Sequence, residues 1–381
     1  MSLYITLVFL SLHFYNTKPV SITTYNNSAL TFNGKIPEGK VAWQSPSNIA
    51  LVKYWGKKEV QIPCNPSISF TLKESYTETV VEYKPTSDKS KVQFSLDGKI
   101  NDQFGDKISN YFNSIEPVFP FIKQLDFTIH SKNTFPHSAG IASSASGMSA
   151  LALCLCSIEK ENFNTFDTED SFFQKASFLA RLGSGSAARS LYSGMVSWGT
   201  IEGNKETSNL WGTAQNKNIH PDFLTFHDSI LIVDAGQKKV SSRIGHGLMN
   251  NNPYAETRFK QAQSNIKELL VALKTGNMEK FINITESEAL TLHAMMMTSN
   301  PYYLLMKPNT LQIIERVFDY RKSTGIPIAF TLDAGPNIHL LYPAKVRSEV
   351  SSFIQAELKQ FTHQSMIIED KVGNGPVKLI V

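Results

Sequence analysis

Apolar and polar residues alternate in several short runs in the first half of the chain, and this period of two is typical of half-buried strands. We expect strands at residues 67–72, 78–83, 92–96, 125–131 and 194–199, and a strand pair within residues 41–55 that bends at Pro46. Stretches with helical character predict helices at residues 106–115, 148–159 and 171–182, and a further helical segment after Ser184.

The second half opens with a buried strand at residues 228–236 and then becomes mainly helical. We expect helices at residues 254–275, 278–297, 309–321 and 346–360, strands at 328–332 and 338–342, and a closing strand pair. Strands and helices are mixed without strict β–α–β alternation. This pattern favours an α+β fold over a doubly wound parallel sheet.

Length and composition indicate an ordinary globular protein. With 381 residues, 41% apolar and 18% charged, the chain can form two domains and is not disordered. The net charge of +4 includes no long like-charge run, which argues against a nucleic-acid-binding protein and leaves room for a local basic pocket. The three cysteines, Cys64, Cys154 and Cys156, are too few for a disulfide scaffold and indicate reduced, buried thiols in a cytoplasmic protein.

The N-terminus carries an apolar run, LYITLVFLSLHF, at residues 3–14. It has the length of a signal peptide and is too short to span a bilayer. No basic residue precedes it and no small-residue cleavage pattern follows it, both of which an export signal needs. We therefore interpret residues 1–40 as an apolar, disordered leader or a mis-assigned start, in preference to an export signal.

The segment GSGSAARSLYSG at residues 183–194 combines glycines and serines with the start of a helical stretch. Backbone N–H groups at such a start attract anions. Arg189 follows Ser186 by three residues, so both side chains share one helix face. A planar cation there suits a carboxylate or phosphate. The alternative is a capped helix with an incidental surface arginine.

A second loop, PHSAGIASSASGMSA at residues 136–150, is rich in small residues and leads into a helix. Small residues allow close approach to a ligand, and the helix start suits phosphate. The pattern is not that of a P-loop. An ordinary capped helix would have the same composition.

Two further segments contain candidate charged groups. Lys53 lies within SPSNIALVKYWGKK at residues 45–58, where its apolar surroundings leave it either to snorkel to solvent or to face an anion. The basic-hydroxyl cluster KKVSSR at residues 238–243 has the same ambiguity. In TLDAGPN, at residues 331–337, an apolar strand leads Asp333 into a tight turn, where it is either a turn cap or a catalytic carboxylate.

Taken together, four motifs resemble the signatures of the diphosphomevalonate decarboxylases, in that family's order. They are NIALVKYWGK at residues 48–57, AGIASSA at 139–145, GSGSAARS at 183–190 and DAGPN at 333–337. This family belongs to the GHMP kinase superfamily, and the match runs from about residue 41 to the C-terminus.

The resemblance implies a two-lobed α+β fold with the active-site cleft between the lobes. An apolar leader (1–40) would precede an N-terminal, ribosomal-protein-S5-domain-2-like, ATP-binding lobe (41–225) and a C-terminal, ferredoxin-like α/β sandwich lobe (226–381). The implied reaction is the ATP-dependent decarboxylation of mevalonate 5-diphosphate to isopentenyl diphosphate, which belongs to the mevalonate pathway and releases ADP, phosphate and CO2. ATP and Mg2+ would be used, and the protein would form a homodimer without nucleic-acid or membrane partners.

The resemblance also assigns roles by motif position. The catalytic residues would be Asp333, Arg189, Lys53 and Asn48, with Asp333 facing the 3-hydroxyl and Arg189 holding the substrate carboxylate. The substrate would also be surrounded by Tyr54, Lys57, Ser184, Gly185, Ser186, Ser242 and Arg243. ATP would contact Ser131, Ala139, Gly140, Ala142, Ser143, Ser144 and Ser146, and the metal ligands stay unassigned.

The chain departs from the family pattern at His137-Ser138, where a Thr-Ala pair is frequent, and in its apolar leader. A mevalonate 3-kinase, a phosphomevalonate decarboxylase and a non-catalytic ligand-binding relative are the alternatives. The presence of Asp333 together with Lys53 and Arg189 favours the decarboxylase.

Overall fold

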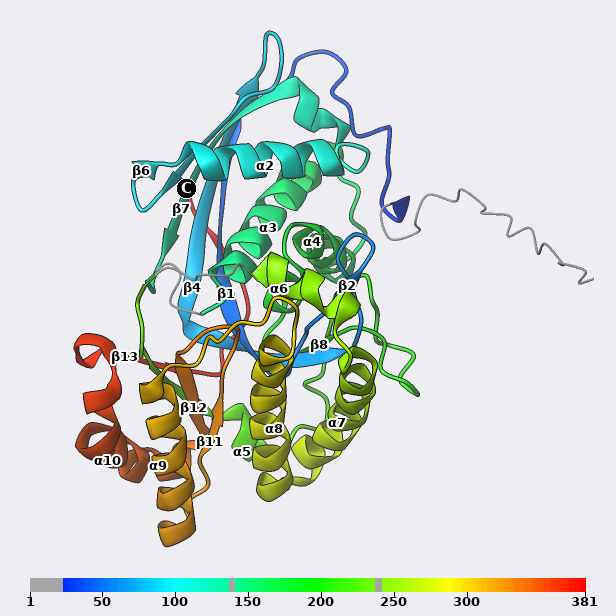
Figure 1. Ribbon diagram of the computed structural model, residues 1–381. Helices are drawn as coiled ribbons and strands as arrows, with labels where there is room; N and C mark the ends of the chain where they lie inside the picture. Colours follow the sequence, from blue (N-terminus) through cyan, green and yellow to red (C-terminus); the bar gives the residue numbers. More distant parts are fainter. Residues whose placement is uncertain (1–22, 137–140, 237–241) are drawn as a thin grey trace, which may run out of the picture.

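The computed structural model describes residues 23–136, 141–236 and 242–381, which form the two halves seen in Figure 1. The larger sheet follows the order β14-β1-β4-β7-β5-β6, and β8 adds to it by pairing with β4 and β9. Its strands are β1 (Gly39–Val52), β4 (Ser67–Pro85), β5 (Val92–Leu96), β6 (Lys99–Ile100), β7 (Leu125–Asn133), β8 (Met195–Trp198), β9 (Gly212–Ala214) and β14 (Val377–Leu379). A separate hairpin joins β2 (Lys57–Lys58) to β3 (Ile62–Pro63).

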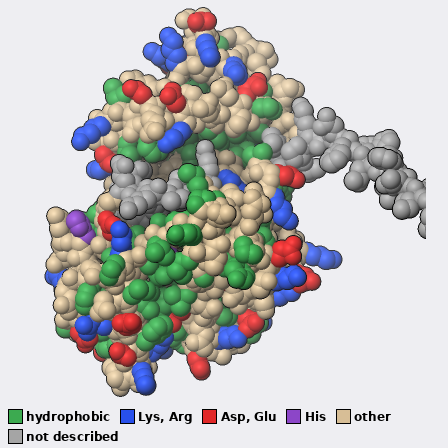
Figure 2. Space-filling model, in the orientation of Figure 1, with side chains coloured by type: hydrophobic (Ala, Val, Ile, Leu, Met, Phe, Trp, Pro, Cys, Tyr) green, Lys and Arg blue, Asp and Glu red, His purple; other side chains and the backbone are tan. Residues whose placement is uncertain are grey.

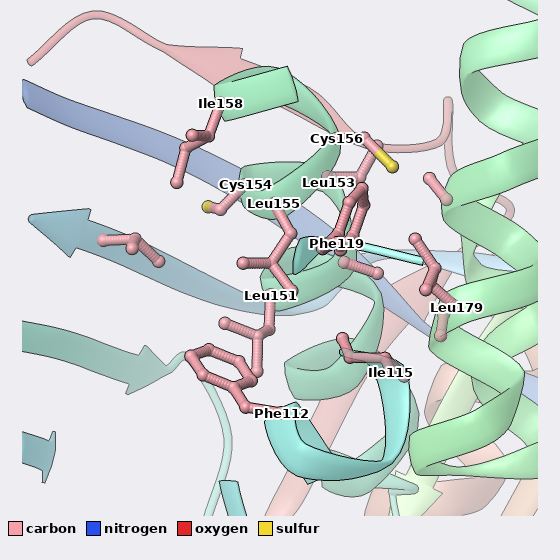
Figure 3. Close-up of a cluster of buried hydrophobic side chains, with 14 of the residues drawn as sticks. Phe112, Ile115, Phe119, Leu151, Leu153, Cys154, Leu155, Cys156, Ile158 and Leu179 are labelled. Carbon is pink, nitrogen blue, oxygen red and sulfur yellow. The ribbon is translucent and has the colours of Figure 1, made fainter. Parts of the chain in front are cut away.

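Among the described residues, the α-helices of this first half are α2 (Asp102–Ile115), α3 (Ser143–Phe163) and α4 (Glu169–Gly183). The helix α3 is buried on nearly all sides from Ser149 to Glu159, as expected of a central helix. Figure 3 shows Cys154 and Cys156 on this helix within the apolar cluster. Both are free thiols, as is the half-buried Cys64, which confirms the expectation that no disulfide forms.

The second half is built on a four-stranded antiparallel sheet of order β11-β12-β10-β13. Its strands are β10 (His227–Leu231), β11 (Ala329–Thr331), β12 (Ile338–Tyr342) and β13 (Ile367–Lys371). The helices are α5 (Pro221–Leu224), α6 (Ser242–Leu248), α7 (Ala255–Thr275), α8 (Met278–Met297), α9 (Pro308–Thr324) and α10 (Arg347–Phe353), the last continuing as a π turn over Ile354–Leu358. No helix among the described residues is both long and apolar enough to cross a bilayer.

One apolar cluster joins the two halves. It contains Ile49 of β1 and Phe70 of β4 together with Ile230 of β10, Ile266 of α7 and Phe281 of α8. Strand β4 is buried at every position over its first six residues, whereas burial alternates along much of its remainder. The cluster therefore holds the carboxyl end of β1 against the second sheet, and this contact positions the candidate site.

Two predicted breaks between strands are wrong, and the strand expected at residues 228–236 ends at Leu231. The expected strand pair around Pro46 is one strand, β1, which absorbs the proline through a register shift between Pro46 and Asn48. Proline lacks the N–H that a regular ladder needs, and a local irregularity accommodates it. The strands expected at residues 67–72 and 78–83 are likewise one strand, β4. The polar residues Lys73 and Glu74 are exposed within it and made it look interrupted.

The expected closing strand pair does not form. β13 pairs with β10 in the smaller sheet, whereas β14 pairs with β1 in the larger one. The last strand thus returns to the first half.

The expectation of a disordered segment up to residue 40 is wrong for residues 23–40. Leu30 is fully buried, and Tyr25 and Phe32 pack against the same core. The Gln124 side chain accepts a hydrogen bond from Phe32 N–H and donates one to Phe32 C=O. This segment is therefore attached to the first half, while residues 1–22 lie outside the described residues.

Candidate active site

Lys53 and Asp333 face each other where the two sheets meet. Lys53 directly follows β1, and Asp333 lies two residues beyond β11. Lys53 Nζ is 2.9 Å from Asp333 Oδ1 and also donates to Ala50 O at 2.7 Å. The Lys53 side chain is 2% exposed and that of Asp333 is 26% exposed. The carboxylate therefore forms the solvent-facing side of a buried charged pair.

Arg189 belongs to the same electrostatic group. Burial lowers the pKa of Lys53. The Asp333 carboxylate opposes this decrease, and the positive charge of Arg189 adds to it. Burial also lowers the pKa of Arg189 to about 10, again opposed by Asp333. Arg189 therefore stays cationic at neutral pH. One carboxylate thus interacts with two buried cations.

The guanidinium of Arg189 is oriented by two hydroxyl groups of strand β4. Its Nε donates to Ser69 Oγ at 3.0 Å and its Nη1 donates to Ser67 Oγ at 2.6 Å. Ser67 Oγ in turn donates to Trp198 O at 3.3 Å. The segment Gly185–Leu191, expected to be helical, is a 3-10 helix (η2). Residues three apart eclipse each other in this helix type, so Ser186 and Arg189 still share a face.

Tyr54 lies between two other aromatic rings. Its ring centroid is 4.7 Å from that of Trp198 and 4.3 Å from that of His246. Burial raises the pKa of Tyr54, whose hydroxyl has no hydrogen-bond partner among the described residues. Gly185 packs directly on this group, because a Cβ there would come within 2.7 Å of Trp198 and 2.9 Å of Tyr54. The glycine is thus required by close packing.

Asn48 connects β1 to the η2 segment. Its Nδ2 donates to Ser190 Oγ at 2.8 Å and to Ser186 O at 3.2 Å. Its Oδ1 is buried and has no partner among the described residues. Asn48 therefore fixes the backbone that carries Ser186 and Arg189.

Lys57 lies on the β2–β3 hairpin at the edge of this group. Its Nζ donates to Gln61 Oε1 at 3.3 Å. Arg181 of α4 anchors the hairpin by donating to Val60 O at 2.8 Å and Gln61 O at 3.2 Å. Since burial lowers the pKa of Arg181 only to about 10, its charge remains available at neutral pH to hold the lysine-bearing hairpin in place.

The loop predicted to hold ATP ends at the start of α3. Ala142 adopts a left-handed conformation (φ 45°), and no side chain among the described residues caps the helix. Ser143 is half-buried and Ser144 exposed. The Ser144 and Ser184 hydroxyls are 3.2 Å apart, so this helix start lies beside the η2 segment. An uncapped helix start with hydroxyl groups suits a phosphate.

Four other predicted ATP contacts and two predicted substrate contacts bond within the protein or lie, wholly or by their side chains, outside the described residues. The Ser146 hydroxyl is fully buried and hydrogen-bonds with the Thr77 hydroxyl and with Ser143 O. The Ser131 hydroxyl, half-buried, pairs with Thr79 across β7 and β4. Ala139 and Gly140 lie outside the described residues, as do the side chains of Ser242 and Arg243 at the start of α6.

Sequence reasoning missed several side chains that shape the site. These are Ser67 and Ser69, which orient Arg189, Trp198 and His246, which enclose Tyr54, and His293, whose Nε2 is 3.2 Å from Asp333 O. The period of two along β4 would have placed both serines on one face, although only the tertiary structure pairs that face with Arg189.

His246 Nδ1 accepts from Gly56 N–H at 3.0 Å, and burial lowers its pKa to about 3. The ring is therefore neutral and carries its proton on Nε2.

Two family models match the chain. The diphosphomevalonate decarboxylase-like N-terminal domain matches residues 45–209, and the mevalonate 5-diphosphate decarboxylase C-terminal domain matches residues 229–378.

Curated relatives give the same result. The chain is 28% identical over 330 residues to a diphosphomevalonate decarboxylase of Ganoderma lucidum, covering 81% of this chain and 80% of the relative. It is 27% identical over 325 residues to the Saccharomyces cerevisiae diphosphomevalonate decarboxylase, covering 81% and 79%.

Solved structures extend the likeness to the fold. A structure described as MDDEF in complex with MVAPP, AMPPCP and magnesium matches with a TM-score of 0.77 and 26% identity, covering 91% of this chain and all of that one. The mevalonate diphosphate decarboxylase of Staphylococcus aureus matches with a TM-score of 0.76 and 26% identity, covering 90% of this chain and 99% of that one. The two-lobed α+β architecture expected from the sequence is confirmed.

Proposed function

The chain belongs to the diphosphomevalonate decarboxylase family, and on this premise we propose that it converts mevalonate 5-diphosphate and ATP into isopentenyl diphosphate, ADP, phosphate and CO2. The observation that carries the proposal is the ion pair of Asp333 with Lys53, which lies within electrostatic reach of the buried Arg189. A carboxylate paired with one buried basic group and near a second suits a substrate that has a carboxylate, a hydroxyl and a diphosphate.

Arg189 would hold the substrate carboxylate. A guanidinium has five N–H donors, and the Ser67 and Ser69 hydroxyls take two of them in a fixed orientation. The planar fork thus reaches the ligand already oriented, which lowers the entropy cost of binding. The unpartnered Tyr54 hydroxyl and the Asn48 carbonyl oxygen, both buried, would accept further substrate or backbone contacts.

Asp333 would orient the 3-hydroxyl and accept its proton. Lys53 Nζ lies 2.9 Å from the Asp333 carboxylate, and a carboxylate, with an ordinary pKa of about 4, is a weak base. A weak base suffices if the proton moves late, as a loose phosphoryl-transfer transition state allows. When the phosphorylated tertiary C–O bond breaks, positive charge grows at that carbon, and the Asp333 carboxylate stabilises it. The electron pair of the bond to the carboxylate then forms the double bond as CO2 leaves.

The start of α3 would receive the ATP phosphates. Its uncapped N–H groups and the Ser143 and Ser144 hydroxyls provide donors beside the η2 segment. Mg2+, when bound with ATP, neutralises phosphate charge. No three His, Cys, Asp or Glu side chains gather at one place in the described ranges, so its protein ligands remain unassigned.

The finer assignments are part of the same proposal. We assign the substrate and nucleotide contacts as predicted from the motifs, with the Ser146 side chain excluded, and we place the lobe boundary near residue 225.

We also propose a homodimer. Figure 2 shows apolar side chains on the surface of the lower half. Among the described residues, the apolar side chains of Tyr302 and Leu304 are 79% and 69% exposed, which suits a partner surface. Light scattering would test this, and a monomeric mass at working concentration would reject it.

The substitution Asp333→Asn tests the function. It removes the charge and keeps the size, so CO2 and ADP release should be abolished while nucleotide binding persists. Asp222→Asn is the matched control, because Asp222 also pairs with a lysine, Lys345, but does so at the surface. Turnover by the Asp333 variant would reject its catalytic role.

Substrate choice is tested on the unmodified protein. ADP and CO2 should both appear with mevalonate 5-diphosphate. ADP without CO2 would identify a 3-kinase, turnover of the monophosphate alone would identify a phosphomevalonate decarboxylase, and no turnover with any mevalonate phosphate would reject an enzyme of this class.

A further inference from the structure

The backbone of Lys53 is held by two side chains of the second half and one of the first. Regular pairing of β1 with β4 ends at Val52, so the ladder does not continue through Lys53. Its N–H donates to Glu288 Oε2 of α8 at 2.9 Å. Its C=O accepts from Asn65 Nδ2 at 2.9 Å and from Arg258 Nη2 of α7 at 3.4 Å. Both polar groups of one peptide position thus depend on distant side chains.

Glu288 and Arg258 form a fully buried ion pair. Their side chains are 0% and 1% exposed. Arg258 Nη1 donates to Glu288 Oε1 at 3.0 Å, and Arg258 Nη2 donates to Glu288 Oε2. Asn265 Nδ2 adds a third contact, to Glu288 Oε1, at 2.6 Å. With the Lys53 N–H, the carboxylate accepts four hydrogen bonds, so its position is fixed from several directions.

Stability alone does not explain such a pair. Removing two charges from water costs about as much as their attraction returns, and apolar replacements are often neutral or stabilising. The pair does, however, reach the residue that contacts Asp333. The Glu288 charge also opposes the effect of burial on the pKa of Lys53. Among the charged groups near Lys53, Asp333 and Glu288 favour its protonation and Arg189 disfavours it, and the Arg258 guanidinium contacts its carbonyl oxygen.

We propose that Glu288 and Arg258 are positioning residues, which hold the Lys53 backbone so that its ammonium group meets Asp333. This role rests on the proposed function only in that Lys53 serves the decarboxylation. The contacts run from α7 and α8 in the second half to the end of β1 in the first. The catalytic pair is therefore assembled by the packing of these two helices against β1.

The substitution Glu288→Gln keeps the size of the side chain and removes its charge. We expect kcat to fall about 10²-fold, because a catalytic group displaced by about 1 Å loses that much. The alkaline limb of the pH–rate profile should move to lower pH, since Lys53 loses a neighbour that favours its charged form. The double variant Arg258→Gln/Glu288→Gln leaves no unpaired buried charge, so it should fold. Its kcat should be lower than that of the wild type, and the alkaline limb of its pH–rate profile should shift less than in Glu288→Gln.

Glu159→Gln is the matched control. Glu159 is also a buried carboxylate, paired with Lys175 at 2.7 Å, but the pair lies within the first half and contacts no predicted site residue. It should lower the thermal midpoint without changing kcat or the pH profile. The inference is overturned if folded Glu288 variants keep wild-type kcat and pH profile, or if Glu159→Gln lowers kcat equally.

A measurement without turnover separates this inference from the proposed function. NMR of 13Cε-labelled lysines, with the Lys53 signal assigned by Lys53→Arg, reports the pKa of Lys53 directly. In Glu288→Gln this pKa should fall, whatever reaction the protein catalyses. An unchanged value would reject the electrostatic part of the positioning role, whereas failure of the wild-type protein to release CO2 would reject the function alone.

Discussion

Replacing Arg189 by lysine keeps the positive charge and removes the planar fork. In the structure, Arg189 Nε and Nη1 each donate to a different hydroxyl, at 3.0 Å to Ser69 and 2.6 Å to Ser67. A lysine ammonium is a single point donor and cannot reproduce both contacts while it also faces a carboxylate.

The expected loss follows from these contacts. A hydrogen bond to a charged group contributes about 1.5–3 kcal/mol. Arg189→Lys loses at least one hydroxyl contact and one arm of the bidentate contact with the substrate, so we expect a loss of about 3–6 kcal/mol in transition-state stabilisation. This corresponds to a decrease in kcat/KM of about 10²- to 10⁴-fold.

The assay is coupled measurement of ADP and CO2 with mevalonate 5-diphosphate, together with thermal unfolding. Arg321→Lys is the control, because Arg321 makes an equivalent bidentate pair with Glu286, at 2.6 and 2.9 Å, outside the site. That variant should lose stability and keep kcat/KM. Wild-type kcat/KM in a folded Arg189→Lys variant would show that the fork is only structural and would refute the reasoning.

Two other substitutions test the surroundings of Tyr54. In Gly185→Ala the new Cβ would displace the Tyr54 and Trp198 rings at a cost of about 1–3 kcal/mol. The KM for the substrate should therefore rise while the KM for the nucleotide stays constant. An unchanged substrate KM would contradict the tight packing. His246 is neutral in the folded protein, where its pKa is about 3, whereas its ordinary pKa in the unfolded chain is 6.5. The unfolded chain therefore binds more protons below pH 6.5, and the free energy of unfolding decreases as the pH is lowered toward 3. His246→Phe removes this contribution, so urea unfolding at about pH 7 and about pH 5 should show about 2 kcal/mol less pH-dependent loss than wild type. Equal losses would reject a neutral, buried His246.

Several elements were predictable from local pattern alone. The bounds of β5, β12 and α8 agree with those expected, and α7 differs by one residue. Their apolar spacing is strong and their ends carry clear signals. The prediction failed where exposed polar residues interrupt an apolar run, as Lys73 and Glu74 do within β4. It also failed for residues 23–40, whose few apolar side chains pack on a core built from distant segments.

For the candidate site, the sequence supplied the residue types and left their partners open. The spacing of Lys53, Arg189 and Asp333 within their motifs identified charged groups at the ends of elements. It could not show that Ser67 and Ser69 orient the guanidinium, because a strand's alternation fixes a face and not what that face contacts. Ser146 illustrates the same limit, since the family resemblance assigned it to the nucleotide loop and only the structure shows that its hydroxyl bonds Thr77.

The sequence by itself determined most of the secondary-structure elements, the α+β class and the four motifs that carry the family likeness, because these depend on neighbours along the chain. The tertiary structure decided that β14 returns to the first sheet and that Lys53 meets Asp333 across 280 positions. It also decided that Glu288 and Arg258 hold the Lys53 backbone. Such long-range pairs form only when the apolar cluster between the two sheets closes, and its burial, not local propensity, supplies the free energy that brings the charged groups together.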